Sequence, residues 1–267
     1  MFAEVNGLRM FYEERGPADG EPIVFLHGFP FDHSMWQHQI EALEQTYRCI
    51  APDLRGHGQT TTLGPAQQPG QVSIAHMAED VIALLNDLHI QQATVCGLSM
   101  GGYIAFALWR THAPRVRQLI LADTRAGPDS EEARQNRFRL AELVLAKGST
   151  AATDAMLPRL FAPANLSSRA AQQIRAIIER TPPAHIVNTL YALANRPDST
   201  ALLPTITVPC LVIVGEHDAI TPPAEAELIC QRIAGAQSPI IVPDAGHLSP
   251  LENPTAFNQA LADFLRR

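Results

Sequence analysis

A serine enclosed by two glycines, in the segment Gly-Leu-Ser-Met-Gly at residues 97–101, constrains the fold of this chain more than any other feature. Residues 92–96 before it have the apolar character of a buried strand, and residues 102–109 after it are typical of a helix packed closely on a sheet. A G-x-S-x-G segment at such a junction forces the serine into an unfavourable backbone conformation and exposes its hydroxyl above the sheet. This context favours a nucleophilic Ser99 over a chance match in a glycine-rich loop.

Short apolar runs recur along the chain and predict the strands of a parallel sheet that is buried on both faces. They cover residues 23–26, 47–51, 93–96, 119–122, 210–214 and 240–242. Helical periodicity lies between them, for example from Ser73, a good N-cap, to residue 85. Strands that alternate with helices imply a mostly parallel, doubly wound α/β sheet. We expect residues 2–13 to form an antiparallel hairpin at the edge of this sheet.

The succession of strands stops between Asp123 and Val208. This segment predicts four helices, over residues 130–147, 150–160, 167–180 and 184–195, with breaks marked by Gly148, Pro158, Pro163, Pro182, Pro183 and Pro197. Its length of about 80 residues is far more than one crossover requires. Helices inserted there would lie over the strand ends, where open α/β sheets bind ligands. We therefore expect a core of residues 1–124 and 205–267 with a helical cap, residues 125–204, inserted between two core strands.

The composition narrows the range of partners. The chain has 20 Lys and Arg against 27 Asp and Glu and no basic cluster, which argues against a nucleic-acid partner. The first residues lack the pattern of a signal peptide, and no apolar stretch is long enough to cross a bilayer. The four cysteines show no C-x-x-C or metal-ligand spacing and predict free thiols. We expect a cytoplasmic protein without metal or organic cofactor that acts on a small molecule, and the oligomeric state stays open.

A serine nucleophile requires a base, and the base requires a group that orients it. His247 is the best candidate base because it follows the last predicted strand and completes the chain order serine, acid, histidine. Asp218 is the favoured acid, although it could instead cap the following helix, and Glu216 and Asp123 stay open as alternatives. Solvent-exposed positions are expected for the histidines at 33, 38, 76, 89, 112 and 185.

Acyl transfer also requires donors for the oxygen that becomes negative in the tetrahedral intermediate. The N–H of Met100, directly after the serine, is one candidate. The N–H of Phe29 is the other, because residues 27–30 follow the first buried parallel strand and Gly28 allows the backbone to approach closely. We therefore predict an oxyanion hole that is formed by Phe29 and Met100.

The chain resembles the α/β-hydrolase superfamily over essentially its whole length. The matching motifs are His-Gly-Phe-Pro at 27–30, Asp-Leu-Arg-Gly-His-Gly at 53–58, Gly-Leu-Ser-Met-Gly-Gly at 97–102, Gly-Glu-His-Asp at 215–218 and Gly-His at 246–247. The resemblance implies the α/β-hydrolase fold, and it implies scaffold roles for Asp53, Arg55 and His57. Thr60 stands where relatives often have serine, a substitution that keeps the hydroxyl group.

Within the superfamily the chain is most similar to small bacterial carboxylesterases with a helical cap, both at residues 121–130 and at residues 196–200. This resemblance implies that a Ser-His-Asp triad hydrolyses short-chain acyl esters through an acyl-enzyme intermediate. The alternatives are a 3-oxoadipate enol-lactonase or other lactonase, and a cofactor-free haloperoxidase or perhydrolase. Hydrolases that cleave carbon–carbon bonds are a minor option, and a catalytically silent binding protein is a reading of a different class. Haloalkane dehalogenases and epoxide hydrolases are excluded because they use aspartate where this chain has Ser99.

Overall fold

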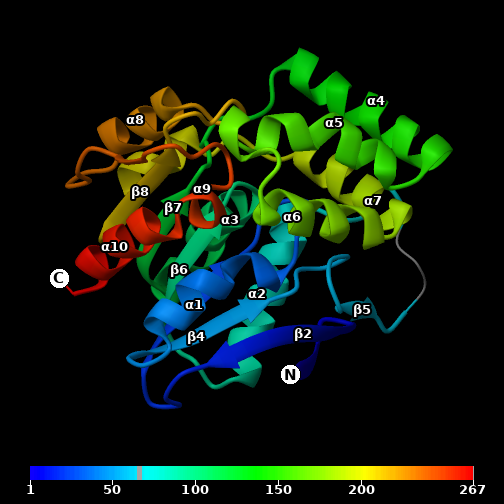
Figure 1. The fold of residues 1–267 in the computed structure, drawn as a ribbon. Helices are drawn as coiled ribbons and strands as arrows, with labels where there is room; N and C mark the ends of the chain where they lie inside the picture. Colours follow the sequence, from blue (N-terminus) through cyan, green and yellow to red (C-terminus); the bar gives the residue numbers. More distant parts are fainter. Residues whose placement is uncertain (65–67, 267) are drawn as a thin grey trace.

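A twisted sheet with helices on both faces forms the centre of the molecule (Figure 1). The computed structural model describes residues 1–64 and 68–266, so residues 65–67 and 267 of the expected core lie outside it. The strands are β1 (Phe2–Val5), β2 (Leu8–Arg15), β3 (Glu21–Leu26), β4 (Tyr47–Pro52), β5 (Thr61–Thr62), β6 (Ala93–Leu98), β7 (Val116–Ala122), β8 (Cys210–Gly215) and β9 (Ile240–Val242). Their order is β1-β2-β4-β3-β6-β7-β8-β9, with β5 paired to β2.

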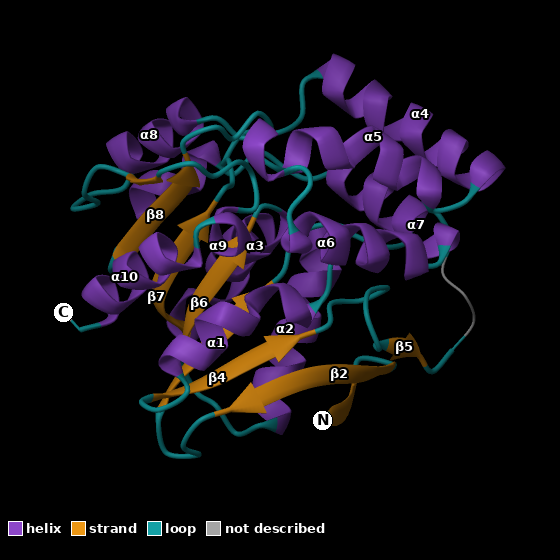
Figure 2. Cartoon of the chain, in the orientation of Figure 1, coloured by secondary structure: helices purple, strands orange, loops and turns teal. Residues whose placement is uncertain are grey.

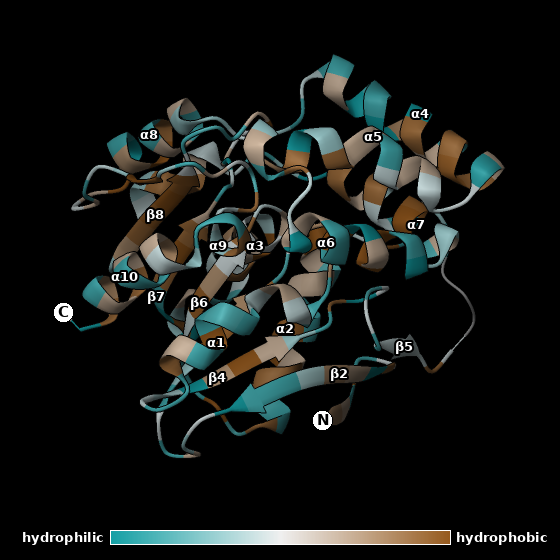
Figure 3. Cartoon of the chain, viewed as in Figure 1, coloured by the Kyte–Doolittle hydropathy of each residue, from teal (hydrophilic) through white to brown (hydrophobic). Residues whose placement is uncertain are grey.

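The parallel part of the sheet confirms the predicted strands. β3, β4, β6, β7, β8 and β9 run parallel, and each includes one of the six apolar runs. Every residue of β6 is buried, as expected for a strand covered on both faces. β1 and β2 form the predicted antiparallel hairpin, and β2 joins it to β4. Figure 3 shows hydrophobic residues concentrated along β7 and β8.

Helices cover both faces of this sheet. Helices α1 (Gln37–Leu43) and α10 (Pro254–Leu265) pack together on one face, while α2 (Ile74–Asp87) and α3 (Met100–His112) pack together on the other (Figure 1). Two further helices, α8 (Pro223–Arg232) and α9 (Ser249–Glu252), follow β8 and β9. The predicted N-cap of α2 is confirmed, because the Ser73 side chain accepts a hydrogen bond from the His76 N–H.

Four helices lie between β7 and β8 in the sequence: α4 (Glu131–Lys147), α5 (Thr150–Leu160), α6 (Arg169–Arg180) and α7 (Pro183–Ala194). We call them the inserted helices. They gather beyond the strand ends toward which β6 and β8 point (Figure 2). The helix expected from residue 167 begins at Arg169, because Ser168 caps it by accepting the Ala171 N–H. Pro158 was expected at a break but lies inside α5, two residues before its end.

None of the helices in the described part of the chain combines the length and the apolar character that crossing a bilayer requires. All four cysteines are free thiols, as predicted. Burial raises the pKa of Cys49 to about 12 and that of Cys230 to about 11, so these thiols stay protonated at neutral pH.

Candidate active site

Ser99 occupies a strained turn between β6 and α3. Its φ of 54° lies in the left-handed region that L-residues avoid. A Cβ on Gly97 would lie 2.3 Å from the Gly101 carbonyl oxygen, and one on Gly101 would lie 2.1 Å from the Leu26 carbonyl oxygen. Both positions therefore require glycine, because any side chain there would overlap the neighbouring backbone. The Ser99 N–H donates to the Ala122 carbonyl at 2.9 Å, which ties the turn to the neighbouring strand.

His247 and Asp218 form a buried pair at the ends of β9 and β8. The distance from His247 Nδ1 to Asp218 Oδ2 is 2.8 Å, and the two residues are 2% and 3% exposed. Burial alone would raise the pKa of Asp218, but the adjacent His247 and the hydrogen bonds from His247 and Thr221 hold it below its ordinary value. An ionised Asp218 keeps the proton on Nδ1, so that Nε2 of His247 is free to accept one.

The two alternative acids occupy different surroundings. Glu216 is exposed, and its carboxylate accepts the Asp244 N–H at 3.2 Å. Asp123 is fully buried and accepts hydrogen bonds from the Gly215 N–H at 2.8 Å and from the Ser249 hydroxyl. Burial, together with the nearby charge of Asp218, raises the pKa of Asp123. Neither alternative has a hydrogen bond to His247 within the described residues, so the geometry favours Asp218.

Asp218 also accepts two backbone N–H groups with its other carboxylate oxygen. It therefore bonds His247 and supports the local turn at the same time.

A cavity of about 460 Å³ gathers four of the five predicted site residues, Phe29, Ser99, Met100 and His247, while Asp218 lies behind His247. The inserted helices supply much of the apolar lining, through Leu140, Met156, Leu160, Leu190 and Leu193. Within the described residues, the N–H groups of Phe29 and Met100 donate to no protein acceptor. The cavity thus brings together a serine hydroxyl, an imidazole and two unpartnered N–H donors, the groups from which an acyl-transfer site can be built.

The chain resembles known proteins over most of its length. Residues 21–254 match the alpha/beta hydrolase fold family. The chain belongs to the α/β-hydrolase family. A 3-oxoadipate enol-lactonase from Acinetobacter baylyi is 33% identical over 259 residues, which are 96% of this chain and 92% of the relative.

Two solved structures resemble the whole hydrolase. A thermophilic esterase from Thermogutta terrifontis is 39% identical, with a TM-score of 0.92 over 100% of this chain and 97% of its own. An enol-lactonase from Burkholderia xenovorans LB400 is 33% identical, with a TM-score of 0.89 over 100% of both chains. These likenesses establish the family and the fold, while the named relatives include both esterases and lactonases.

The loop with Phe29 in this hydrolase is fixed by a buried histidine. His27 Nε2 accepts the Leu54 N–H at 3.0 Å, so its Nδ1 carries the proton and donates to the Gly28 carbonyl at 2.8 Å. Burial lowers the pKa of His27, which keeps the ring neutral and able to make both bonds. A Cβ on Gly28 would lie 2.9 Å from a Leu98 methyl group, so the packing of the Leu98 side chain leaves little room for a larger residue at this position.

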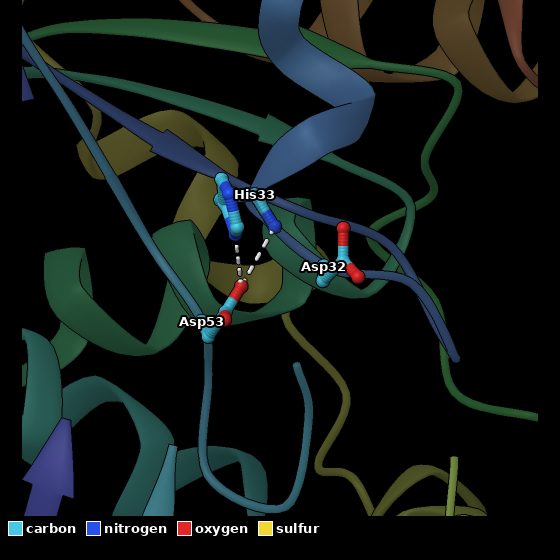
Figure 4. A group of neighbouring side chains, drawn as sticks. All are labelled: Asp32, His33 and Asp53. Atoms are coloured by element: carbon cyan, nitrogen blue, oxygen red, sulfur yellow. Dashed lines mark hydrogen bonds and ion pairs between the residues drawn. The ribbon is translucent and has the colours of Figure 1, made fainter. Parts of the chain in front are cut away.

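Asp32, His33 and Asp53 form a cluster just after the loop with Phe29, and their side chains are of the types that can bind a metal ion (Figure 4). Asp53 Oδ1 accepts the His33 N–H at 2.9 Å and bonds His33 Nδ1 at 2.7 Å, while its other oxygen accepts the Gln59 N–H. Asp32 accepts the Ser34 N–H and pairs with Arg180 of α6. Protein N–H groups thus occupy these carboxylates, which confirms the scaffold role of Asp53. The expectation that His33 is merely solvated was wrong, because its tertiary pairing leaves no trace in the local sequence.

One arginine joins the two ends of the segment that contains the inserted helices. Arg196, after α7, pairs with Asp129, before α4, at 2.6 Å and donates to the Gly127 carbonyl at 3.1 Å. Its guanidinium lies 4.3 Å from the ring centre of Tyr103 on the helix that follows Ser99. We call this contact set the Arg196 clasp. No sequence pattern predicted this contact between residues near the two ends of the segment.

The burial of His57 should make the free energy of unfolding depend on pH. Burial, with a contribution from His27, lowers the pKa of His57 to about 3. An unfolded histidine takes up a proton near pH ~6.5 while the folded one stays neutral, so stability is full above that pH and falls by about 1.4 kcal/mol per unit below it. His57→Gln should therefore reduce the loss of unfolding free energy between pH 7 and pH 5 by about 2 kcal/mol in urea titrations.

The exposed His76 on α2 provides the matched control, because His76→Gln makes the same chemical change at a position that leaves buried His57 in place. An equal pH dependence in wild type and His57→Gln would contradict the assignment of a buried, neutral His57.

Proposed function

We propose that the protein is a carboxylesterase that hydrolyses short-chain acyl esters through Ser99, His247 and Asp218. The observation that carries the proposal is the cavity shared by Ser99 and a histidine whose Nδ1 is held by a buried carboxylate. Esterases among the similar structures support the same class. The substrate is a small ester, and no step requires a metal or an organic cofactor.

The proposed reaction proceeds in two halves. His247 Nε2 removes the proton of the Ser99 hydroxyl, and the serine oxygen attacks the ester carbonyl. The carbonyl oxygen becomes negative and accepts hydrogen bonds from the Phe29 and Met100 N–H groups. Collapse of the intermediate breaks the bond to the alcohol, which leaves with the proton from His247. Water then attacks the acyl-enzyme in the same way and releases the acid.

The preference for short acyl groups rests on the inserted helices, which we propose act as a cap. Leu140 of α4, Met156 of α5 and Leu190 of α7 line the cavity beyond Ser99. Apolar walls of this kind bind an alkyl chain by excluding water, and their spacing limits its length.

This proposal predicts a chain-length profile on p-nitrophenyl esters, with highest kcat/KM for short acyl groups. Met156→Ala, which enlarges the cavity, should move the optimum toward longer chains without abolishing turnover of the best short ester. Leu143→Ala is the matched control, because Leu143 lies on α4 but is exposed and outside the cavity. A wild-type optimum on long acyl chains, rising at a lipid–water interface, would contradict the proposal.

A 3-oxoadipate enol-lactonase is the second candidate, supported by the relatives named as enol-lactonases and by Arg125 and Arg159 at the cavity. A third arginine of the cavity lining, Arg137, pairs with Asp129. Arg159 donates to the Ala219 carbonyl at 3.3 Å, and Arg125 donates to the adjacent Ile220 carbonyl. Arg125 Nη1 also lies 3.8 Å from Glu225 Oε1. The enol-lactone of a dicarboxylic acid keeps one free carboxylate, which two guanidinium groups are suited to bind.

Two acyl groups of equal length separate the candidates. The p-nitrophenyl monoester of glutarate ends in a carboxylate where p-nitrophenyl pentanoate ends in a methyl group. If the arginines bind a substrate carboxylate, Arg159→Gln should lower kcat/KM for the glutarate ester by about tenfold or more and leave the pentanoate ester unchanged. Equal effects on both would reject this candidate, and direct enol-lactone and perhydrolysis assays complete the comparison.

Covalent labelling separates any enzyme from a silent binding protein. An organophosphonate ester should label Ser99, because labelling requires the same activated hydroxyl as ester hydrolysis. An unlabelled Ser99 in folded protein would favour the binding-protein alternative.

A further inference from the structure

The carboxylate of Glu252, at the end of α9, joins two segments that are far apart in the sequence. Its Oε1 accepts the N–H groups of Gly246 at 2.8 Å and Leu248 at 3.3 Å, which are the neighbours of His247 on either side. Its Oε2 accepts the Ala162 N–H at 2.8 Å and the Asn165 side-chain amide at 2.9 Å. Residues 162 and 165 lie between α5 and α6 of the inserted helices.

The backbones at this joint are in direct contact. A Cβ on Gly246 would lie 2.5 Å from the Ala162 nitrogen and 2.7 Å from the Phe161 carbonyl carbon. Asn165 also donates to the Asp244 carbonyl at 2.9 Å. The loop that carries His247 therefore rests on the segment 161–165 with no room for an intervening side chain.

The core holds α9 from its other end. The Ser249 hydroxyl donates to Asp123 at the end of β7, and Asp123 also accepts the Gly215 N–H at the end of β8. Glu252 thus extends from a helix that is fixed to the sheet, and its carboxylate has a defined position from which to hold the loop.

The Leu248 N–H belongs to the peptide plane that directly follows His247, and the Gly246 N–H belongs to the plane one residue before His247. Bonds to one carboxylate on both sides therefore restrict the backbone from which the His247 side chain extends. Hydrogen bonds to a carboxylate are about twice as strong as neutral ones. A displacement of about 1 Å at a catalytic group costs on the order of 10²-fold in rate. Glu252 bonds the backbone beside His247 rather than the imidazole ring, so its effect on chemistry acts through the placement of that ring.

We propose that Glu252 is a positioning residue that makes the placement of His247 depend on the inserted segment 161–165. The inference rests on the proposed function in one respect, since it takes His247 to be the base. It assigns a physical link between the helices that line the substrate cavity and the group that moves the proton.

Glu252→Gln tests the link. The amide keeps the size of the side chain, but its NH₂ group replaces one carboxylate oxygen and cannot accept a hydrogen bond. The two bonds that this oxygen accepted are therefore lost. We expect a loss of about 10²-fold in the rate of organophosphonate labelling and in kcat for the best ester, with little change in KM. Asp263→Asn, an acid-to-amide change at an exposed position on α10, is the matched control and should keep the wild-type rates.

Asn165→Ala weakens the link from the other side, because it removes one donor to Oε2 and the bond to the Asp244 carbonyl but leaves the bonds of Glu252 to Gly246 and Leu248 in place. We expect a smaller loss of kcat than in Glu252→Gln. In the double variant the two losses should combine to less than their product, since both act on one carboxylate. This variant also keeps the inference testable if Glu252→Gln does not fold.

A measurement without substrate separates this inference from the proposed function. The proton between His247 Nδ1 and Asp218 gives a downfield ¹H NMR resonance, which should shift or broaden in Glu252→Gln and stay unchanged in Asp263→Asn. If the wild type hydrolyses no ester but the resonance and the labelling rate respond, Glu252 keeps its role while the esterase proposal fails. The inference would be overturned if folded Glu252→Gln kept the wild-type resonance and labelling rate. It would also be overturned if Asn165→Ala kept the wild-type labelling rate and the double variant labelled at the rate of Glu252→Gln alone.

Discussion

Ser99→Ala is expected to remove ester hydrolysis almost completely, with a loss on the order of 10⁶-fold in kcat. In the proposed reaction, the side chain of Ser99 forms the covalent bond that joins the acyl group to the protein. The variant should fold, because Gly97 and Gly101 still permit the turn and the Ser99 side chain makes no capping hydrogen bond to α3. The measurement is kcat on the best short p-nitrophenyl ester, with circular dichroism to confirm the fold.

Ser73→Ala is a suitable control, since this serine caps α2 and is not part of the cavity lining. It should cost about 1 kcal/mol of stability and leave kcat unchanged. A Ser99→Ala protein that retained one tenth of the wild-type activity would exclude Ser99 as the nucleophile.

Asp218→Asn is expected to lower kcat by about 10⁴-fold while the protein stays folded. The amide keeps the shape of the carboxylate but can donate a hydrogen bond to His247 Nδ1. The imidazole proton then lies on Nε2, and Nε2 can no longer accept the proton of the Ser99 hydroxyl. The loss of a negative charge also leaves the imidazolium that forms during the reaction without its counter-ion.

Asp123→Asn is the internal control for this result. An amide at 123 can still accept the Gly215 N–H and bond the Ser249 hydroxyl, so kcat should fall far less than in Asp218→Asn. The reverse order of effects would move the acid to the end of β7 and leave Asp218 as a residue that supports the turn before α8.

The sequence contained most of the fold because its signals are local. Apolar runs mark strands of a sheet buried on both faces, and the glycines around Ser99 mark a turn that no other residue type fits. The predicted pairing of His247 with Asp218 followed from where their strands end, since carboxyl ends of parallel strands meet at one edge.

The contacts that the sequence did not reveal join segments with no shared pattern. Glu252 and Ala162 are 90 positions apart, and Asp32 and Arg180 are 148 apart. Each pair depends on how the inserted helices settle on the sheet, which is decided by packing rather than by periodicity. Glu252, five residues after His247, has the sequence pattern of an ordinary surface residue, and only its tertiary neighbours distinguish it. His33 was misjudged for the same reason.

The Arg196 clasp brings the start and the end of the inserted segment to one point beside Tyr103. A segment whose ends meet can be exchanged between related genes by recombination without rerouting the chain around it. Lineages of such proteins can therefore diversify their substrates by trading whole segments while they inherit the reactive residues unchanged. The joint at Glu252 sets a condition on this exchange: a transplanted segment has to offer an N–H to that carboxylate, and an engineer who grafts a new one should design that contact first.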